Sequence, residues 1–144
     1  MEWAGTVAVS FAVAATLLMV WWQWLDSGVP FEVVTMPDSG AEVVDGTLRV
    51  RRYWRVTEQT TFEVAREMRR VGAPDEPRLS IMLPSMVVSQ PPGEYASDRW
   101  YALPAGIPPG WYEVVSMVTW QANPLRRQST TLPVVRVLIE PPRK

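Results

Sequence analysis

The N-terminal part of the chain contains a long run without a single charged side chain. It extends from Trp3 to Leu25, between the acidic residues Glu2 and Asp26. As an α-helix rising about 1.5 Å per residue, such a run is roughly 34 Å long, enough to cross a hydrocarbon core of about 30 Å. The sequence therefore predicts a transmembrane signal-anchor helix within residues 1–25.

Tryptophans lie at both ends of this run, where indole rings favour the membrane–water interface. A cleaved signal peptide would need a basic n-region and a small-residue cleavage site, and a buried or interfacial helix would need a polar face. The run has none of these features. We therefore favour a span that is retained, with its interfacial residues at Trp3, Trp21, Trp22 and Trp24.

The orientation and assembly of the span are less strongly marked. No basic residue closely flanks it, so the positive-inside rule has little to act on, but the absence of basic residues from 26 to 48 permits export. We expect the N-terminus inside and the following domain outside the cytoplasm, in the periplasm or at the cell surface. Ala4, Ala8 and Ala12 recur every four residues, which would let the helix of a second copy approach closely. The alternative is that alanine simply fills the span.

Three absences limit the chemistry available to the chain. It has no cysteine and no histidine, and Lys144 at the C-terminus is its single lysine. These absences remove disulfides, the commonest general base, the commonest zinc ligand and a well-placed catalytic lysine. The net charge of −1 argues against a dedicated nucleic-acid binder. We therefore expect no enzymatic activity, no cofactor and no metal.

After a linker at residues 26–30, short apolar runs alternate with turn signals, and residues 141–144 form a tail. Within 47–56 every second residue is apolar apart from Arg52, a period typical of a half-buried strand. The run at 60–71 fits a helix nearly as well, but we favour a strand. The predicted strands are 31–35, 47–56, 60–71, 79–89 with an interruption at Pro84, 99–103, 111–121 and 134–140.

Seven short strands with regularly spaced turns favour an antiparallel β-sandwich. A segment rich in proline and glycine, 103–110, comes directly before the apolar strand predicted at 111–121, which begins with Trp111 and Tyr112. This segment resembles the E–F corner of immunoglobulin-like domains, where a tyrosine fastens the turn. The resemblance implies that role for Tyr112 and a mainly β, Ig-like sandwich over residues 31–140, of the class without a cysteine pair.

Two short motifs near the C-terminus carry a second resemblance. They are Asn123-Pro124-Leu125 and Pro133-Val134-Val135. Together with an N-terminal span and a cysteine-free sandwich, they make the chain similar to small phage-encoded single-pass membrane proteins. This resemblance implies a phage or bacterial-envelope setting and implies no activity.

The polar face of the strand 47–56 is the first candidate binding site. Its guanidinium groups would project to one side about 7 to 14 Å apart, where they could bind phosphates or carboxylates of an anionic surface. The alternative is a solvated face on which cross-strand ion pairs form with Glu58, Glu63 and Glu67. We call this set the arginine face: Arg49, Arg51, Tyr53 and Arg55.

Aromatic residues near predicted loops are the second candidate, because aromatic side chains are frequent in recognition surfaces. The alternative is packing at the ends of the sandwich, and Trp54 and Trp120 are expected in its core. The set comprises Tyr95, Trp100, Tyr101 and Trp111.

Loop carboxylates are the third candidate, for glycoside hydrolysis or calcium binding. Their spacing matches no calcium loop, and roles in turns and caps explain them. They are Asp38, Asp45, Asp75, Glu76, Glu94 and Asp98.

The function predicted from these features is that of a non-enzymatic, membrane-tethered interaction module at the bacterial envelope. Its expected partners are the lipid bilayer, another protein and a second copy of the chain. The first alternative is a structural subunit of a virion or of a multi-subunit membrane or secretion assembly. The second alternative is a carboxylate-dependent glycosidase.

Overall fold

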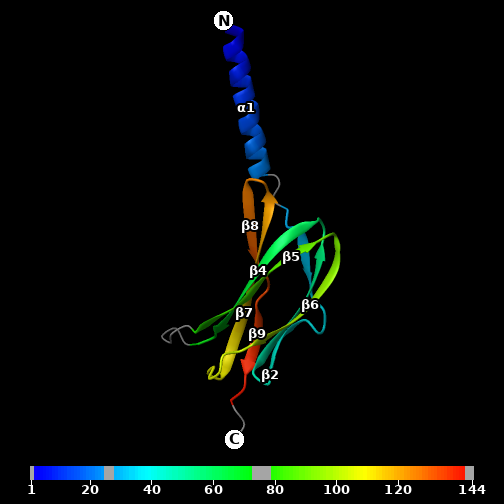
Figure 1. Ribbon diagram of the computed structural model, residues 1–144, viewed down its shortest axis with the longest axis vertical. Coiled ribbons are helices and arrows are strands. Elements are labelled where there is room, and N and C mark those ends of the chain that lie inside the picture. Colours follow the sequence, from blue (N-terminus) through cyan, green and yellow to red (C-terminus); the bar gives the residue numbers. More distant parts are fainter. Residues whose placement is uncertain (1, 25–27, 73–78, 142–144) are drawn as a thin grey trace.

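The computed structural model describes residues 2–24, 28–72 and 79–141, which form one helix and nine strands (Figure 1). The elements are α1 (Glu2–Trp24), β1 (Phe31–Val34), β2 (Gly40–Val44), β3 (Thr47–Val56), β4 (Thr60–Arg70), β5 (Ser80–Gln90), β6 (Gly93–Ala102), β7 (Gly110–Asn123), β8 (Arg126–Thr131) and β9 (Val135–Ile139). The chain is therefore mainly β, as its sequence predicts.

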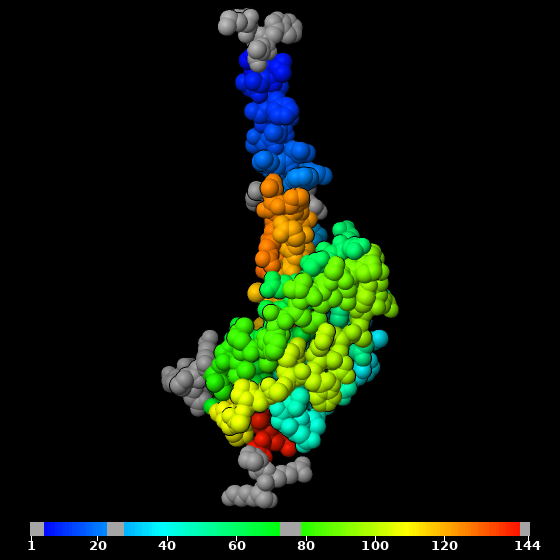
Figure 2. Space-filling model, in the orientation of Figure 1, coloured from blue at the N-terminus to red at the C-terminus, as the bar shows by residue number. Residues whose placement is uncertain are grey.

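Helix α1 stands away from the strands as a separate rod (Figures 1 and 2). Its segment Gly5–Trp22 is long and apolar enough to cross a membrane, and none of it is buried against the rest of the chain. The hydroxyls of Ser10 and Thr16 donate to carbonyls four residues earlier, at 2.9 and 2.8 Å, which satisfies them within the helix. Leu25, the predicted last residue of the span, lies outside the described residues.

The strands form two antiparallel sheets. In the four-stranded sheet, β3 is the centre, with β6 along one side and β1 and β2 in succession along the other. In the five-stranded sheet the order is β5-β4-β7, and β7 pairs with β9 through its first half and with β8 through its second. The predicted strand at 60–71 is confirmed, because β4 pairs with β5 and β7 along its length.

Two strands were not predicted. β2 is short, but the turn at Asp45 and Gly46, with φ values of 49° and 74°, joins it to β3 as a tight hairpin. β8 reads Arg-Arg-Gln-Ser-Thr-Thr and has no apolar alternation, so its pairing with β7, rather than its own pattern, makes it a strand. Strand β6 also begins earlier than predicted, at Gly93 instead of residue 99.

The predicted interruption of β5 at Pro84 is wrong, since the strand continues from Ser80 to Gln90. β5 pairs only with β4 and so lies at an edge, where a proline is tolerated. Pro84 also lies where the β4–β5 register shifts, between Val64 and Arg66. The missing amide therefore falls at an irregularity in the ladder.

The two sheets face each other across a core made of two apolar clusters. Each cluster draws side chains from both sheets. At the end nearer α1, the ring of Phe31 meets Phe62 and Trp120 edge to face, with centroids 5.3 and 5.6 Å apart. The first cluster is Leu48, Val50, Met68, Leu83, Tyr101, Tyr112, Val114 and Val137, and the second is Val56, Phe62, Val118 and Trp120.

A set of polar residues separates the clusters. Arg52 in β3 and Arg66 in β4 are only 6% and 4% exposed, and each lies between apolar neighbours of the two clusters along its strand. Arg52 pairs across the ladder with Ser97, and Arg66 pairs with Ser116, so each serine shares the inward face of its arginine. We call Arg52, Arg66, Ser97 and Ser116 the polar layer.

Candidate functional site

The end of α1 is fastened to the turn between β7 and β8. The side-chain amide of Asn123, which is buried, donates to the carbonyl of Trp22 at 2.7 Å. The side-chain oxygen of Asn123 accepts the amide of Leu125 at 2.9 Å, an Asx-type turn. The Asn-Pro-Leu motif singled out in the sequence therefore builds the joint between helix and sheets.

Exposed apolar side chains surround this joint. Trp21, Trp22 and Leu125 are all exposed, on the helix end and on the adjoining turn. Ala8 and Ala12 are exposed on the helix, with no described residue packed over them. Trp3, Ala4 and Trp24 belong to the helix, but their side chains lie outside the described part. The expected roles of these residues at the membrane interface and in helix packing stay predictions.

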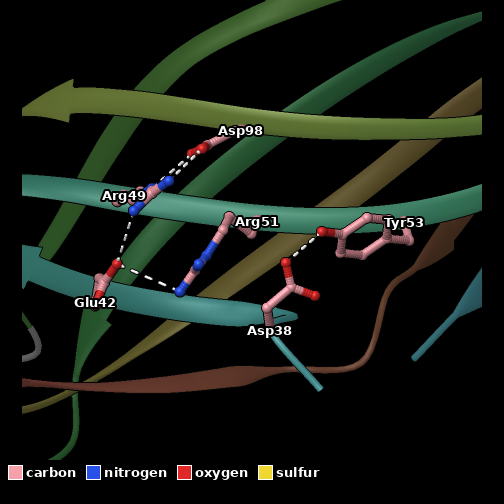
Figure 3. A network of polar contacts seen from close by, with 6 residues as sticks. All are labelled: Asp38, Glu42, Arg49, Arg51, Tyr53 and Asp98. Carbon is pink, nitrogen blue, oxygen red and sulfur yellow. Dashed lines mark hydrogen bonds and ion pairs between the residues drawn. The ribbon is translucent and has the colours of Figure 1, made fainter. Parts of the chain in front are cut away.

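The arginine face lies on the outer side of the four-stranded sheet, as predicted, and its members contact neighbouring acids (Figure 3). Arg49 donates to both carboxylate oxygens of Asp98, at 2.9 and 2.6 Å. Arg49 and Arg51 both reach one oxygen of Glu42, at 3.3 and 3.4 Å. The two guanidiniums therefore share Glu42, and Arg49 binds Asp98 as well.

The remaining members of the arginine face are paired too. Tyr53 donates its hydroxyl to Asp38 at 2.5 Å, and Arg55 contacts Glu94 at 2.7 Å. Every guanidinium of the face thus has an acid within ion-pair distance. The face is neutralised by its own sheet, which leaves little excess charge for an anionic ligand.

The expected acid partners were wrong, although pairing itself was among the alternatives. Glu63 pairs with Arg127 and Glu67 with Arg69, because both acids belong to β4 of the other sheet. No ion pair of the described residues joins Glu58 to the arginine face. The actual partners come from the β2 hairpin and from β6, strands whose extent was not predicted.

These contacts shift the acidity of the groups involved. The hydrogen bond from Arg49, followed by the charges of Arg49 and Arg51, holds the pKa of Asp98 below its usual value against the opposing effect of burial. The same hydrogen bond raises the pKa of Arg49. The bond to Asp38 raises the pKa of Tyr53. All three groups therefore keep their ordinary charge at neutral pH.

The aromatic candidates separate into different parts of the molecule. Trp100 is 52% exposed, and the guanidinium carbon of Arg49 lies 4.8 Å from its ring centre, a cation–π contact. Trp111 is 53% exposed but belongs to β7, in the other sheet. Tyr95 is half-buried and stacks on Trp54 at 6.1 Å.

Tyr101 does not belong to an exposed set. It is only 8% exposed, because alternation along β6 turns it inward while its neighbour Trp100 faces outward. It joins the first core cluster, and its hydroxyl accepts from Arg66 at 2.5 Å. Trp120 is buried, as expected, whereas Trp54 is half-buried.

The loop carboxylates act mainly as partners of basic or hydroxyl groups. Asp38, Glu94 and Asp98 are engaged as described above, and Asp45 occupies the β2–β3 turn. Asp75 and Glu76 lie outside the described residues. Within residues 2–24, 28–72 and 79–141, no group of three or more acids could hold a metal ion.

The polar layer is the site that sequence reasoning missed. The signal was present at Arg52, which interrupts the apolar face of its strand. Arg66 has the same parity as Phe62 and Met68 and so also points inward. The polar layer could have been found from the sequence by looking for two strands that each carry an arginine at an inward position.

Comparison with known proteins gives no family assignment. No family model matches the chain, and no curated protein matches it. A solved structure with some similarity is that of Spo0M, a sporulation control protein from Bacillus subtilis. It shares 16% identity over 78% of this chain and 51% of its own, with a TM-score of 0.42. The chain thus spans about half the length of that protein, and at this score the likeness carries no argument.

Proposed function

We propose that the chain is a non-enzymatic, membrane-tethered interaction module whose β domain lies outside the cytoplasm. One observation carries this proposal: none of the apolar segment Gly5–Trp22 is buried against the described strands, which it meets through the carbonyl of Trp22, so its apolar side chains are available to lipid. In water such a surface would be a strong drive for aggregation. A bilayer is the environment in which it is stable.

The joint at Asn123 supports tethering rather than loose attachment. It fixes the β7–β8 turn beside the carbonyl of Trp22, close to the end of the apolar segment. The domain would therefore be held near the headgroups, with Leu125 and Trp22 at the interface. A module held in this way presents the outer faces of its sheets to a partner at a fixed distance from the membrane surface.

We also propose a fold class for the β domain. We place the domain in the broad Ig-like class, supported by the hydrogen bond from the Tyr112 hydroxyl to the carbonyl of Pro108, at 2.7 Å. A tyrosine that returns to the backbone a few residues upstream is a hallmark of that corner. The bacterial or phage setting stays a prediction from the sequence.

The outer face of the four-stranded sheet is the surface proposed for a protein partner. Trp100 and Arg49 form an exposed pair there, and Trp and Arg are the residues that most often dominate binding energy at interfaces. The neutral charge of the surrounding network favours a protein surface over a highly charged polymer.

Single-cysteine labelling tests the topology, because the native chain has no cysteine. The exposed Ser85 in β5 and Glu2 at the N-terminus are each replaced by cysteine in separate variants. We expect a membrane-impermeant maleimide to label Ser85→Cys in intact spheroplasts and Glu2→Cys only after lysis. Labelling of Ser85→Cys only after lysis would refute an external domain. Recovery of the chain in the soluble fraction would refute tethering.

A further inference from the structure

The polar layer places unpaired donors between the two sheets. Arg52 Nε and Arg66 Nε are buried, and neither has a hydrogen-bond partner among the described residues. The buried hydroxyls of Ser97 and Ser116 are also without partners there, and each lies directly across a ladder from one of these arginines. Two guanidinium groups and two hydroxyls thus converge on the middle of the core.

One other nitrogen of each arginine donates to a neutral acceptor. Arg52 donates through Nη2 to the carbonyl of Pro133 at 2.8 Å, and Arg66 donates through Nη1 to the hydroxyl of Tyr101. Each bond crosses toward the opposite side of the core, so both guanidiniums are fixed. The Nε–H group of each arginine still has no hydrogen-bond partner among the described residues.

No carboxylate balances these two charges in the part of the chain that the structure describes, where all ion pairs involve other arginines. Arginine stays protonated in proteins, and a buried charge is costly unless it is paired. The two guanidiniums also repel each other: burial, and then the charge of Arg66, lowers the pKa of Arg52. An anion placed between them would remove both penalties.

A cavity opens beside the arginines with walls that are otherwise apolar. Its volume is about 50 Å³, and both Arg52 and Arg66 line it. Since a single water needs roughly 10–15 Å³ of such space, the cavity suits a group of a few heavy atoms. The apolar part of its wall includes Phe31, Val33, Phe62, Val64, Val118 and Leu132.

We propose that Arg52 and Arg66, which both line this cavity, form a binding site for the carboxylate group of a small apolar monocarboxylate. The two guanidiniums would neutralise the carboxylate. The apolar walls would contact the hydrocarbon part, which sets this ligand apart from inorganic anions. The site is independent of membrane topology and goes beyond the proposed function.

The free edge of the sandwich offers a way in. A second hollow, of about 270 Å³, adjoins the cavity and shares Trp54, Met86 and Val88 with it. It lies between β5 and β6, two edge strands that each pair with a neighbour on one side, β5 with β4 and β6 with β3. Trp54 donates to Gln90 at 2.8 Å across this edge. The ligand's hydrocarbon part would lie toward this opening.

The test is a titration of the full chain in phosphatidylcholine nanodiscs, with the arginine side chains labelled with ¹⁵N. Butyrate is the probe, and acetate, butanol and inorganic phosphate are the comparison ligands. We expect saturable shifts of the Arg52 and Arg66 Nε–Hε signals with butyrate, weaker binding of acetate and no effect of butanol. The signals of Arg49 and Arg55, which already have acids, should not move.

Substitutions locate the site. Arg52→Met and Arg66→Met should each abolish saturable butyrate binding, whereas Arg55→Met, on the outer face of the same strand as Arg52, should leave it unchanged. The titration of the parent chain needs no substitution, so it keeps the test decisive if an arginine variant does not fold.

Three results would overturn the proposal. The first is the absence of any saturable shift at Arg52 and Arg66 up to high butyrate concentrations. The second is an equal shift at Arg49 and Arg55, which would indicate general screening. The third is tighter binding of phosphate than of butyrate, which would reject the carboxylate assignment. A failed topology experiment would leave this titration unaffected, so the two proposals fail separately.

Discussion

Arginines on the outside and on the inside of the same sheets have opposite surroundings. Arg49, Arg51 and Arg55 point outward, and each has a carboxylate within 3.4 Å. Arg52 and Arg66 point inward and have only neutral acceptors among the described residues. Exposed ion pairs contribute little to stability, whereas an unpaired interior charge is costly. The unusual feature of this molecule is therefore the pair of buried arginines in its core, and not the charged outer face of the four-stranded sheet.

Replacing an inward arginine should have the largest effect. Arg52→Met keeps most of the side-chain volume and removes a buried charge, so we expect the free energy of unfolding to rise by about 1–4 kcal/mol in the absence of ligand. Urea unfolding followed by tryptophan fluorescence measures this. A clear loss of stability would show that the bond to Pro133 outweighs the charge, and the contrast with the outer arginines would then fail.

Removal of the Tyr101 hydroxyl, which accepts a hydrogen bond from Arg66, should have the next largest effect. Tyr101→Phe leaves the Arg66 guanidinium without its hydroxyl partner in a buried position, which should lower the free energy of unfolding by about 1–3 kcal/mol. Tyr53→Phe is the matched control, because it removes a hydroxyl that contacts Asp38 on the exposed face. Its unfolding midpoint should coincide with that of the parent protein. Equal losses in the two variants would contradict the comparison.

The sequence predicted the outer arginines better than the inner ones for a physical reason. Period-two alternation assigns each residue of β3 to a face, and it placed Arg49 and Arg51 outside correctly. It cannot say which acids lie across the ladder, because that depends on register and on β2 and the first half of β6, which the alternation did not reveal. Two polar residues that converge from different sheets, such as Arg52 and Arg66, are joined only by the packing of the sheets.

Local features of the chain could be predicted from the sequence, and contacts between distant residues could not. An uncharged run long enough for a helix is a local property, so α1 could be read directly from the chain. The bond from the Tyr112 hydroxyl to Pro108 spans only four residues and was likewise foreseeable. The bond between Asn123 and Trp22 joins residues about a hundred positions apart, and no local pattern indicates it.

Acid should weaken the outer network selectively. The pKa of Asp98 is lowered in the folded state, chiefly by the hydrogen bond from Arg49. The contribution of the Asp98 carboxylate to the free energy of unfolding is therefore complete above the unfolded-state pKa of about 3.9. It is lost as the pH falls through the lower folded-state pKa. We expect Asp98→Asn to be slightly less stable than the parent at pH 6 and the two urea midpoints to converge near pH 2. If the urea midpoints of the two proteins differed by the same amount at every pH in this range, the ion pair between Arg49 and Asp98 would contribute nothing to stability.

The smallest effect is expected at Arg55, an outward residue of β3, the strand that also carries the inward Arg52. Its ion pair with Glu94 is highly exposed on both sides, so solvent and salt already screen most of the attraction. Arg55→Met should unfold at the same urea concentration as the parent, both at low salt and in 1 M sodium chloride. The same substitution at position 52 should shift the midpoint at either salt concentration, because salt does not screen a charge enclosed by the core. A salt-sensitive shift at Arg52 would place that side chain in contact with water and remove the physical basis for treating the two sets of arginines differently.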